Sequence, residues 1–89
     1  GLVCTSDLMA AGAIHALKNR AVRVPEDVSV IGMNNTQYAE ACYPTITSLD
    51  TRRTQASKLA AKTLIKAIDS GIIEKDIVLD TEIVIREST

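Results

Sequence analysis

The sequence predicts an α/β fold built on a parallel sheet. Residues 28–31 (Val-Ser-Val-Ile) form a nearly continuous apolar run that ends at Gly32 and is soon followed by two asparagines. Such a run is typical of a strand buried on both faces, as in parallel sheets that helices cover. In these sheets, ligands bind beyond the carboxyl ends of the strands. We therefore expect Asn34 and Asn35 to lie at the edge where a binding site would form.

Length and composition indicate one small domain or a part of a larger one. The chain has 89 residues, of which 46% are hydrophobic and 24% charged, and this balance is ordinary for a soluble domain. Its formal net charge of −1 gives no general attraction for nucleic acid. The chain begins inside an apparent strand without an initial methionine, so we expect a fragment. Nothing resembles a signal peptide or a membrane span, and we expect a cytoplasmic location.

The first third of the chain predicts a strand, a helix and a second strand. Residues 2–4 are apolar, and Thr5 or Ser6 can cap a helix at about residues 7–19. Apolar residues at three-residue spacing give this helix a buried face, and Gly12 in its middle suggests close packing against a neighbour. The run that starts at residue 28 then follows after a crossover of about 20 residues, which is typical of a parallel βαβ unit.

The remainder predicts a further strand, a long helix and two closing strands. The expected limits are a weak helical turn at 36–41, a strand at 46–49, a helix at 52–70 and strands at 77–79 and 82–86. Asp50 or Thr51 is expected to cap the long helix, and Gly71 is expected to end it. The strands and helices thus alternate as in an α/β protein.

No combination of residues predicts a reaction centre. The one histidine, His15, falls on the polar side of the first helix and has no second ligand at metal spacing. There is no Gly-x-Ser-x-Gly motif, no glycine-rich phosphate loop and no cysteine pair at zinc spacing. A row of lysines on the long helix, Lys58, Lys62 and Lys66, is expected to face solvent. We therefore expect no catalytic residue, no metal and no cofactor.

Polar residues follow each of the first three predicted strands. They are Thr-Ser-Asp at 5–7, Asn-Asn at 34–35 and Asp-Thr at 50–51. If these strands are parallel, the polar groups converge on one edge, where they suit hydrogen bonding to a polyhydroxylated or similarly polar small molecule. The alternative is that they are ordinary turn and cap residues, which any α/β protein carries at its strand ends.

Four segments of the chain, in this order, carry a resemblance to a known family. They are Cys4 to Ala13, Val24 to Gly32, Tyr43 to Leu49 and Ile83 to Thr89. They resemble the effector-binding region of the lactose/galactose-repressor family of bacterial transcription regulators. The resemblance implies a periplasmic-binding-protein-like fold of two α/β lobes with a small-molecule effector, commonly a sugar, in the cleft. It also implies a homodimer that binds operator DNA through an N-terminal helix-turn-helix.

The resemblance extends over essentially the whole chain and implies a place for it. Residues 1–89 correspond to the C-terminal part of the effector-binding and dimerisation domain, without the helix-turn-helix and most of the first lobe. The helix at 52–70 is then implied to pack on the first lobe. We expect that apolar area on this helix is exposed when the chain is alone.

The resemblance further implies which residues bind the effector and form the dimer. Ser6 stands where the family often has an effector-binding asparagine, and Thr51 stands where a glutamine is common. Asn34 replaces a frequent sugar-binding aspartate, and Asn35 lies beside it. The implied dimer interface consists of Leu8, Ala11, His15, Tyr38, Cys42 and Tyr43.

Two other classes of protein remain as alternatives. An extracytoplasmic sugar-binding protein of a transporter would have a related fold and a signal sequence, which the upstream sequence would show. An α/β enzyme fragment would show an acid, a base or metal ligands grouped together. The free cysteines, Cys4 and Cys42, mildly favour the cytoplasm over an oxidising compartment.

Overall fold

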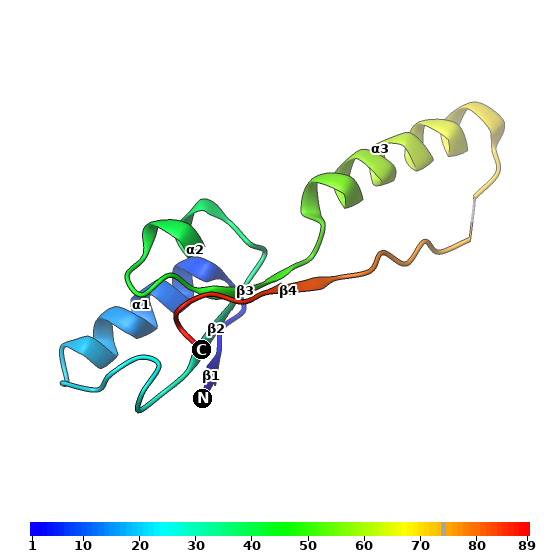
Figure 1. Ribbon diagram of the computed structural model, residues 1–89. Helices are drawn as coiled ribbons and strands as arrows, with labels where there is room; N and C mark the ends of the chain where they lie inside the picture. The colour runs from blue at the N-terminus through cyan, green and yellow to red at the C-terminus, as the bar shows by residue number, and fades with distance from the viewer. Residues whose placement is uncertain (74) are drawn as a thin grey trace.

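The computed structural model describes residues 1–73 and 75–89 and shows a mixed α/β architecture (Figure 1). Its elements are β1 (Leu2–Val3), α1 (Asp7–Lys18), β2 (Val30–Met33), α2 (Gln37–Ala41), β3 (Thr47–Asp50), α3 (Arg53–Ser70) and β4 (Glu82–Val84). The predicted order of strands and helices is confirmed, apart from the segment at 77–79. Ser6 is the residue that caps α1, and its hydroxyl accepts a hydrogen bond from the Met9 N–H at 3.2 Å.

The four strands form one sheet in the order β1-β2-β3-β4. The first three are parallel, with Leu2 opposite Val30 and Ile31 opposite Thr47. β4 joins the edge in the antiparallel direction. The fold class that the sequence predicts is therefore confirmed, and the sheet gains an antiparallel edge strand, as many doubly wound sheets do.

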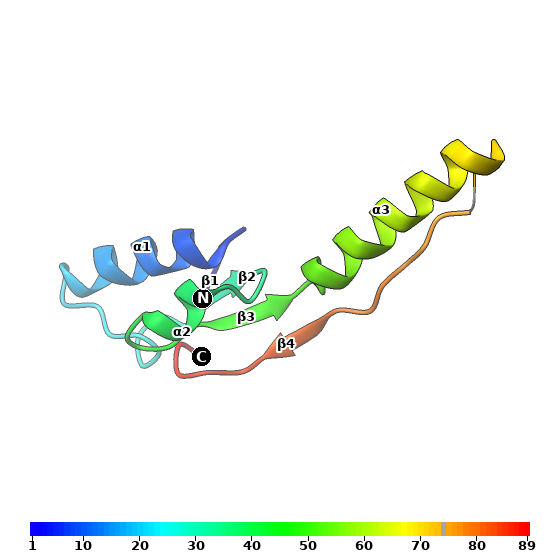
Figure 2. The same ribbon diagram turned by 90° about the horizontal axis from the view of Figure 1, so that it is seen from above.

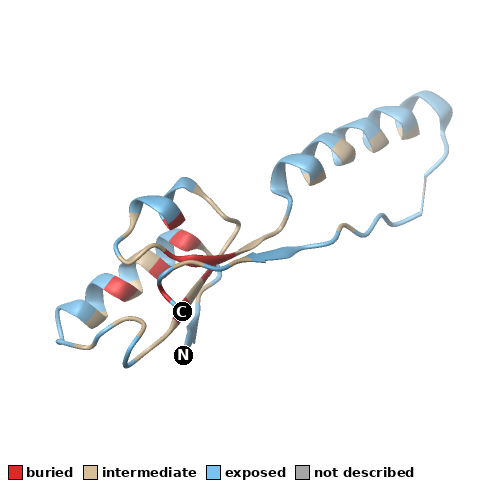
Figure 3. Ribbon diagram, viewed as in Figure 1, coloured by how far each residue is buried: buried red, intermediate tan, exposed pale blue. Residues whose placement is uncertain are grey.

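The core is small and lies where α1 and α2 meet the sheet (Figure 3). Its fully buried apolar residues are Ala10, Ile14, Val30, Ala39 and Ile46. The helix α3, in contrast, has no buried residue and projects away from the sheet (Figures 1 and 2). The molecule is consequently elongated, with extents of 58 × 17 × 16 Å.

The predicted strand at 77–79, in the segment that returns from α3, is not observed. Residues 77–79 are neither helix nor strand, although their sequence is apolar and rich in β-branched residues. The reason is the length of the neighbouring strand, because β3 ends at Asp50 and its last pairing is with Glu82. Residues before Glu82 therefore have no backbone partner in the sheet, and a strand needs one.

The start of α3 and the middle of α1 correct two further predictions. Neither Asp50 nor Thr51 caps α3: the cap position is Arg52, which is left-handed with φ 52° and has no side-chain cap. The Asp50 carboxylate accepts from the Arg52 N–H instead, at 2.8 Å. Gly71 ends the helix as predicted, with φ 70°. Gly12 is exposed, and a Cβ there would meet nothing within 4 Å, so no close packing explains it within this chain.

The C-terminal residues close the end of the sheet at which β2 and β3 begin. Ser88 is fully buried: its hydroxyl donates to the Val30 carbonyl at 2.5 Å and accepts from the Thr47 N–H at 2.9 Å. Glu87 accepts from both the N–H and the hydroxyl of Thr45 at 3.0 Å. These hydrogen bonds lower the pKa of the Glu87 carboxyl. The last residues of the chain are therefore part of the sheet's framework.

The carboxyl ends of the strands are tied together by the buried carboxylate of Asp7, at the first position of α1. One oxygen accepts from the Ser48 hydroxyl on β3 at 2.5 Å. The other accepts from the N–H and the hydroxyl of Thr36 at 2.6 and 2.8 Å. A Cβ on Gly32 would lie 2.3 Å from an Asp7 oxygen, so β2 needs glycine at this position.

Replacing Asp7 by alanine is expected to destabilise the fold by about 3 kcal/mol, because the Ser48 hydroxyl and the Thr36 N–H lose their buried acceptor. The free energy of unfolding in urea, followed by circular dichroism, measures this change. Asp69→Ala on the exposed surface of α3 is the matched control and should stay within about 0.5 kcal/mol of the wild type. Equal stability of the two variants would contradict the structural role of Asp7.

Candidate functional site

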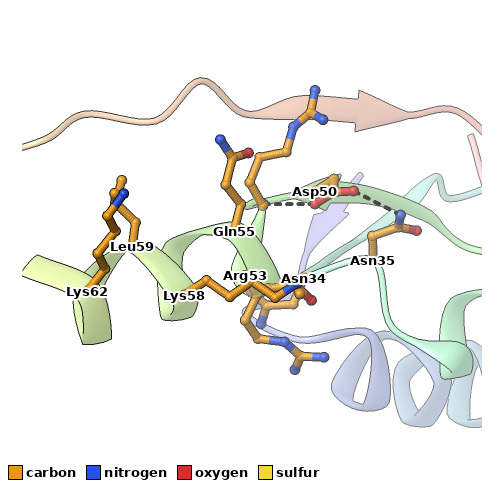
Figure 4. A pocket seen from close by; sticks show the side chains of 10 residues that line it. Asn34, Asn35, Asp50, Arg53, Gln55, Lys58, Leu59 and Lys62 are labelled. Carbon is orange, nitrogen blue, oxygen red and sulfur yellow. Dashed lines mark hydrogen bonds between the residues drawn. The ribbon is translucent and has the colours of Figure 1, made fainter.

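A cleft of about 660 Å³ lies at the carboxyl ends of β2 and β3, against the first half of α3 (Figure 4). Its size falls in the range of small-molecule sites. The lining residues are mostly polar or charged: Asn34, Asn35, Asp50, Arg52, Arg53, Thr54, Gln55, Lys58, Leu59 and Lys62. The position is the one that an open parallel sheet provides for ligands.

Backbone geometry explains why two asparagines follow β2. Asn34 and Asn35 are both left-handed, with φ 84° and 45°. Asparagine tolerates this conformation better than other residues with a side chain, apart from aspartate. The Asn34 N–H still bonds the Leu49 carbonyl at 2.8 Å, so the chain turns while remaining attached to β3. The Thr51 hydroxyl donates to Asn34 Oδ1 at 3.0 Å and fixes the orientation of its amide.

The amide of Asn35 is held on both sides. Its Oδ1 accepts from the Arg86 guanidinium at 2.7 Å, and its Nδ2 donates to Asp50 at 3.2 Å. Its backbone N–H donates to the Ser48 hydroxyl at 2.9 Å, the same hydroxyl that donates to Asp7. Arg86 itself is held by the Ile46 carbonyl at 2.9 Å, and its side chain is only 13% exposed. The orientation of the Asn35 amide therefore depends on a residue 51 positions further along the chain.

Asp50 is the acidic residue of the cleft lining, and its charge is stabilised by hydrogen bonds. The Arg52 N–H and the Asn35 amide donate to its two oxygens and lower the pKa of the carboxyl, the Arg52 N–H being the larger cause. The guanidinium of Arg52 points to Glu82 on β4 and forms an ion pair at 3.1 Å. The strand before α3 and the strand after it, β3 and β4, are thus connected beside the cleft.

The structure brings together part of the predicted effector-binding set. Asn34 and Asn35 line the cleft, whereas Thr51 does not line it but donates a hydrogen bond to Asn34. Ser6 does not line it, because its hydroxyl caps α1. The predicted dimer residues lie mostly on the surface of α1 and around α2: Leu8, His15, Tyr38 and Tyr43 are exposed, whereas Ala11 and Cys42 are partly buried against the core.

Sequence reasoning missed the contribution of α3 to the cleft. Lys58 and Lys62 are exposed, as their row on the helix predicted, but they also line the cleft. Their four-residue spacing was the available signal, since it places both on one face of the helix. Nothing in the local sequence indicated Arg86, because its role depends on the pairing of β4 with β3.

Two further properties bear on the kind of site. Within residues 1–73 and 75–89, no group of three or more histidine, cysteine, aspartate or glutamate side chains is placed to hold a metal ion. Over the same residues, none of the helices is both long and apolar enough to cross a membrane.

The fold is an α/β domain with a candidate ligand site at the carboxyl ends of its parallel strands. The chain belongs to the periplasmic binding protein-like domain family, whose model matches residues 1–89. The resemblance seen in the sequence is therefore confirmed.

Among known proteins, the chain is 40% identical over its full length to the transcriptional regulator RegA of Clostridium saccharobutylicum and 32% identical over 97% of its length to the transcriptional repressor CytR of Escherichia coli K12. It spans 27% and 26% of these relatives, about a quarter of their length. Among solved structures, it resembles the complex of the transcriptional regulator CelR with cellobiose, with a TM-score of 0.90 and 33% identity. That match covers 99% of this chain and 28% of the other.

The titration of Asp50 tests the geometry of the cleft. Its carboxyl is expected to titrate below the ordinary range, and Asn35→Ala is expected to raise its pKa by removing one of its two donors. Because the pKa is lower in the folded state, these hydrogen bonds contribute their full stability above the unfolded pKa. That contribution is lost as the pH falls through the folded pKa.

Carboxyl ¹³C chemical shifts between pH 2 and pH 7, roughly the range over which aspartates titrate, give the Asp50 midpoint. Asn19→Ala, at the far end of α1, removes an amide that does not touch Asp50 and should leave the midpoint unchanged. An identical midpoint in wild type and Asn35→Ala would mean that the Asn35 contact is not made in solution.

Proposed function

We propose that the chain is the C-terminal part of the effector-binding and dimerisation domain of a bacterial transcriptional repressor, with a sugar as the effector. The observation that carries this proposal is the cleft, where Asn34 and Asn35 present amides beside the basic and polar side chains of α3. Its relatives support the regulatory role, since RegA and CytR are named as transcription regulators. The CelR structure supports the sugar, since it is a complex with cellobiose.

The wider partners follow from the same relatives. Operator DNA is bound by a helix-turn-helix elsewhere in the protein, and the whole acts in the cytoplasm as a regulator rather than an enzyme. The similarity to regulators favours this proposal over an extracytoplasmic sugar-binding protein of a transporter. The chain's own net charge of −1 fits a segment that does not contact DNA directly.

The geometry suggests how the effector acts. The cleft lies between the sheet and α3, and α3 projects beyond the end of β3 (Figure 2). A ligand that contacts Asn34 on one side and Lys58 on the other favours the arrangement in which both contacts form. Effector binding is thereby coupled to the angle of α3, which is a hinge mechanism. A regulator uses such a change to alter its affinity for operator DNA.

The dimer interface is proposed on the face formed by α1 and the segment around α2. Leu8 is 59% exposed, Tyr38 44% and Tyr43 81%. Large apolar and aromatic side chains in one region indicate a surface that a partner covers. His15 and the partly buried Ala11 and Cys42 complete the proposed face. A second copy of the chain covers it by two-fold symmetry, the commonest arrangement of homodimers.

Asn34→Gly is expected to weaken effector binding by about 1 to 3 kcal/mol, the cost of one hydrogen bond to a ligand with its partner left unpaired. Glycine is suited to the φ of 84°, so this variant keeps the backbone while it removes the amide. Titration calorimetry of the full-length protein with its sugar effector measures the loss. Gln37→Gly, on an exposed residue outside the cleft, is the control. Unchanged affinity of Asn34→Gly would remove this residue from the site.

Leu8→Asp combined with Tyr43→Asp is expected to convert the dimer to a monomer, because two charges would be buried without partners at the proposed interface. Size-exclusion chromatography with light scattering on the full-length protein gives the mass. Val78→Asp introduces the same charge at a residue that is 89% exposed and outside the proposed face, on the segment that returns from α3, and this variant should remain a dimer. A wild-type monomer, or a dimeric double variant, would contradict the assignment of this face.

A further inference from the structure

Several hydrogen-bonding groups of the cleft are already engaged within the chain. Asn34 Oδ1 already accepts from Thr51, which leaves its Nδ2 to face a ligand. Both oxygens of Asp50 already accept a hydrogen bond, one from the Arg52 N–H and one from Asn35. The amide of Asn35 is occupied at both ends. Each of these oxygens has a second lone pair, so Asp50 and Asn34 can still accept from a sugar hydroxyl, and it is the charge of the cleft that distinguishes one class of effector from another.

The lining of the cleft is mainly basic. Four cationic side chains line it, namely Arg52, Arg53, Lys58 and Lys62, against one carboxylate, Asp50. This concentration differs from the chain as a whole, whose formal net charge is −1. Within the described part of the chain, the side chain of Arg52 pairs with Glu82. The side chains of Arg53, Lys58 and Lys62 have no hydrogen bond or ion pair there. A cluster of like charges of this kind is unfavourable until an anion joins it.

The beginning of α3 adds to this effect. The first turn of the helix lines the cleft through Arg53, Thr54 and Gln55. It contains no acidic residue, and no side chain caps it. The free N–H groups and the positive end of the helix dipole therefore remain available to a negative group. In Figure 4, the Lys58 side chain extends along the cleft toward Asn34, so this lysine and the amide approach one ligand position.

We propose that the effector of this cleft is an anionic sugar, carrying a phosphate or a carboxylate. The proposal rests on the proposed function, and it narrows the class of effector from sugars in general to negatively charged ones. The anionic group binds between Lys58, Lys62 and the start of α3, where charge-assisted hydrogen bonds are available. The sugar ring contacts Asn34, whose neutral amide does not repel the anion as an aspartate at this position would.

Matched ligands that differ only in charge test the proposal. The full-length protein is titrated with glucose, glucose 6-phosphate and glucuronate, and with cellobiose, cellobiose 6-phosphate and cellobionate, with inorganic phosphate alone as a further probe. At least one anionic sugar is expected to bind about tenfold or more tightly than its neutral counterpart, and its affinity is expected to fall as sodium chloride is raised. The phosphate and carboxylate members of each set identify which group is bound.

Substitutions then localise the effect. Lys58→Gln and Lys62→Gln are each expected to weaken the anionic sugar about fivefold to tenfold, while affinity for the neutral sugar changes by less than about twofold. Lys66→Gln carries the same change of charge on the same helix but does not line the cleft, so it serves as the control. Asn34→Asp is expected to weaken the anionic sugar through repulsion while keeping a residue that accepts the left-handed backbone.

The outcomes separate this inference from the proposed function. Binding of a neutral sugar as tight as that of its anionic counterpart, or a loss in Lys66→Gln equal to that in Lys58→Gln, overturns the anionic effector and leaves the sugar-responsive regulator intact. Binding of inorganic phosphate as tight as that of the sugar phosphates also overturns it, because the sugar would then contribute nothing. Absence of binding by every sugar in both sets overturns the inference together with the sugar effector.

Discussion

The buried carboxylate of Asp7 is the interaction on which the rest of the structure depends. It joins the start of α1 to the turn after β2 and to the middle of β3. A buried carboxylate without partners would be costly, but this one accepts three hydrogen bonds from two residues. Its position in turn requires Gly32, because any side chain on β2 at this point would occupy the place of the carboxylate. A single charged group therefore aligns the strand ends that form the cleft.

A second network links the cleft to the end of the chain. Arg86 reaches the cleft through Asn35, which connects it to Asp50. The same stretch places Ser88 between β2 and β3 at the opposite end of the strands. The C-terminal segment thus holds both ends of the β2–β3 pair, although only β4 counts as a strand. An alteration in how this segment pairs with β3 would change the orientation of the Asn35 amide, which lines the cleft.

The sequence predicted the elements well where local patterns determine them. The capping serine of α1 and the glycine that ends α3 depend on neighbouring residues and are confirmed. A strand near Gly32 is confirmed too, but it runs from Val30 to Met33 and so begins later than predicted and continues past the glycine. The prediction of a strand at 77–79 was wrong because a strand also requires a partner, and β3 ends before it could pair with this segment. The spacing of Lys58 and Lys62 places them on one face of α3, but the sequence does not show that this face turns toward the cleft, and the contact of Arg86 with Asn35 arises from the pairing of β4. Neither the pairing of β4 nor the direction of α3 can be read from patterns along the sequence.

The helix α3 shows how the cleft and an apolar surface are related. Its basic side chains Arg53, Lys58 and Lys62 line the cleft, while Ala60, Leu64 and Ile68 line a second, mainly apolar cavity of about 630 Å³ together with Ile73, Ile77 and Leu79. Leu59 lines both. Because α3 is one continuous helix, a surface that covers its apolar face and a ligand in the proposed site would both contact the same element. The ligand and the covering surface therefore act on one element, and each biases the angle that the other requires. This is the physical condition for coupling a binding event to a distant change, since both partners shift the same conformational equilibrium.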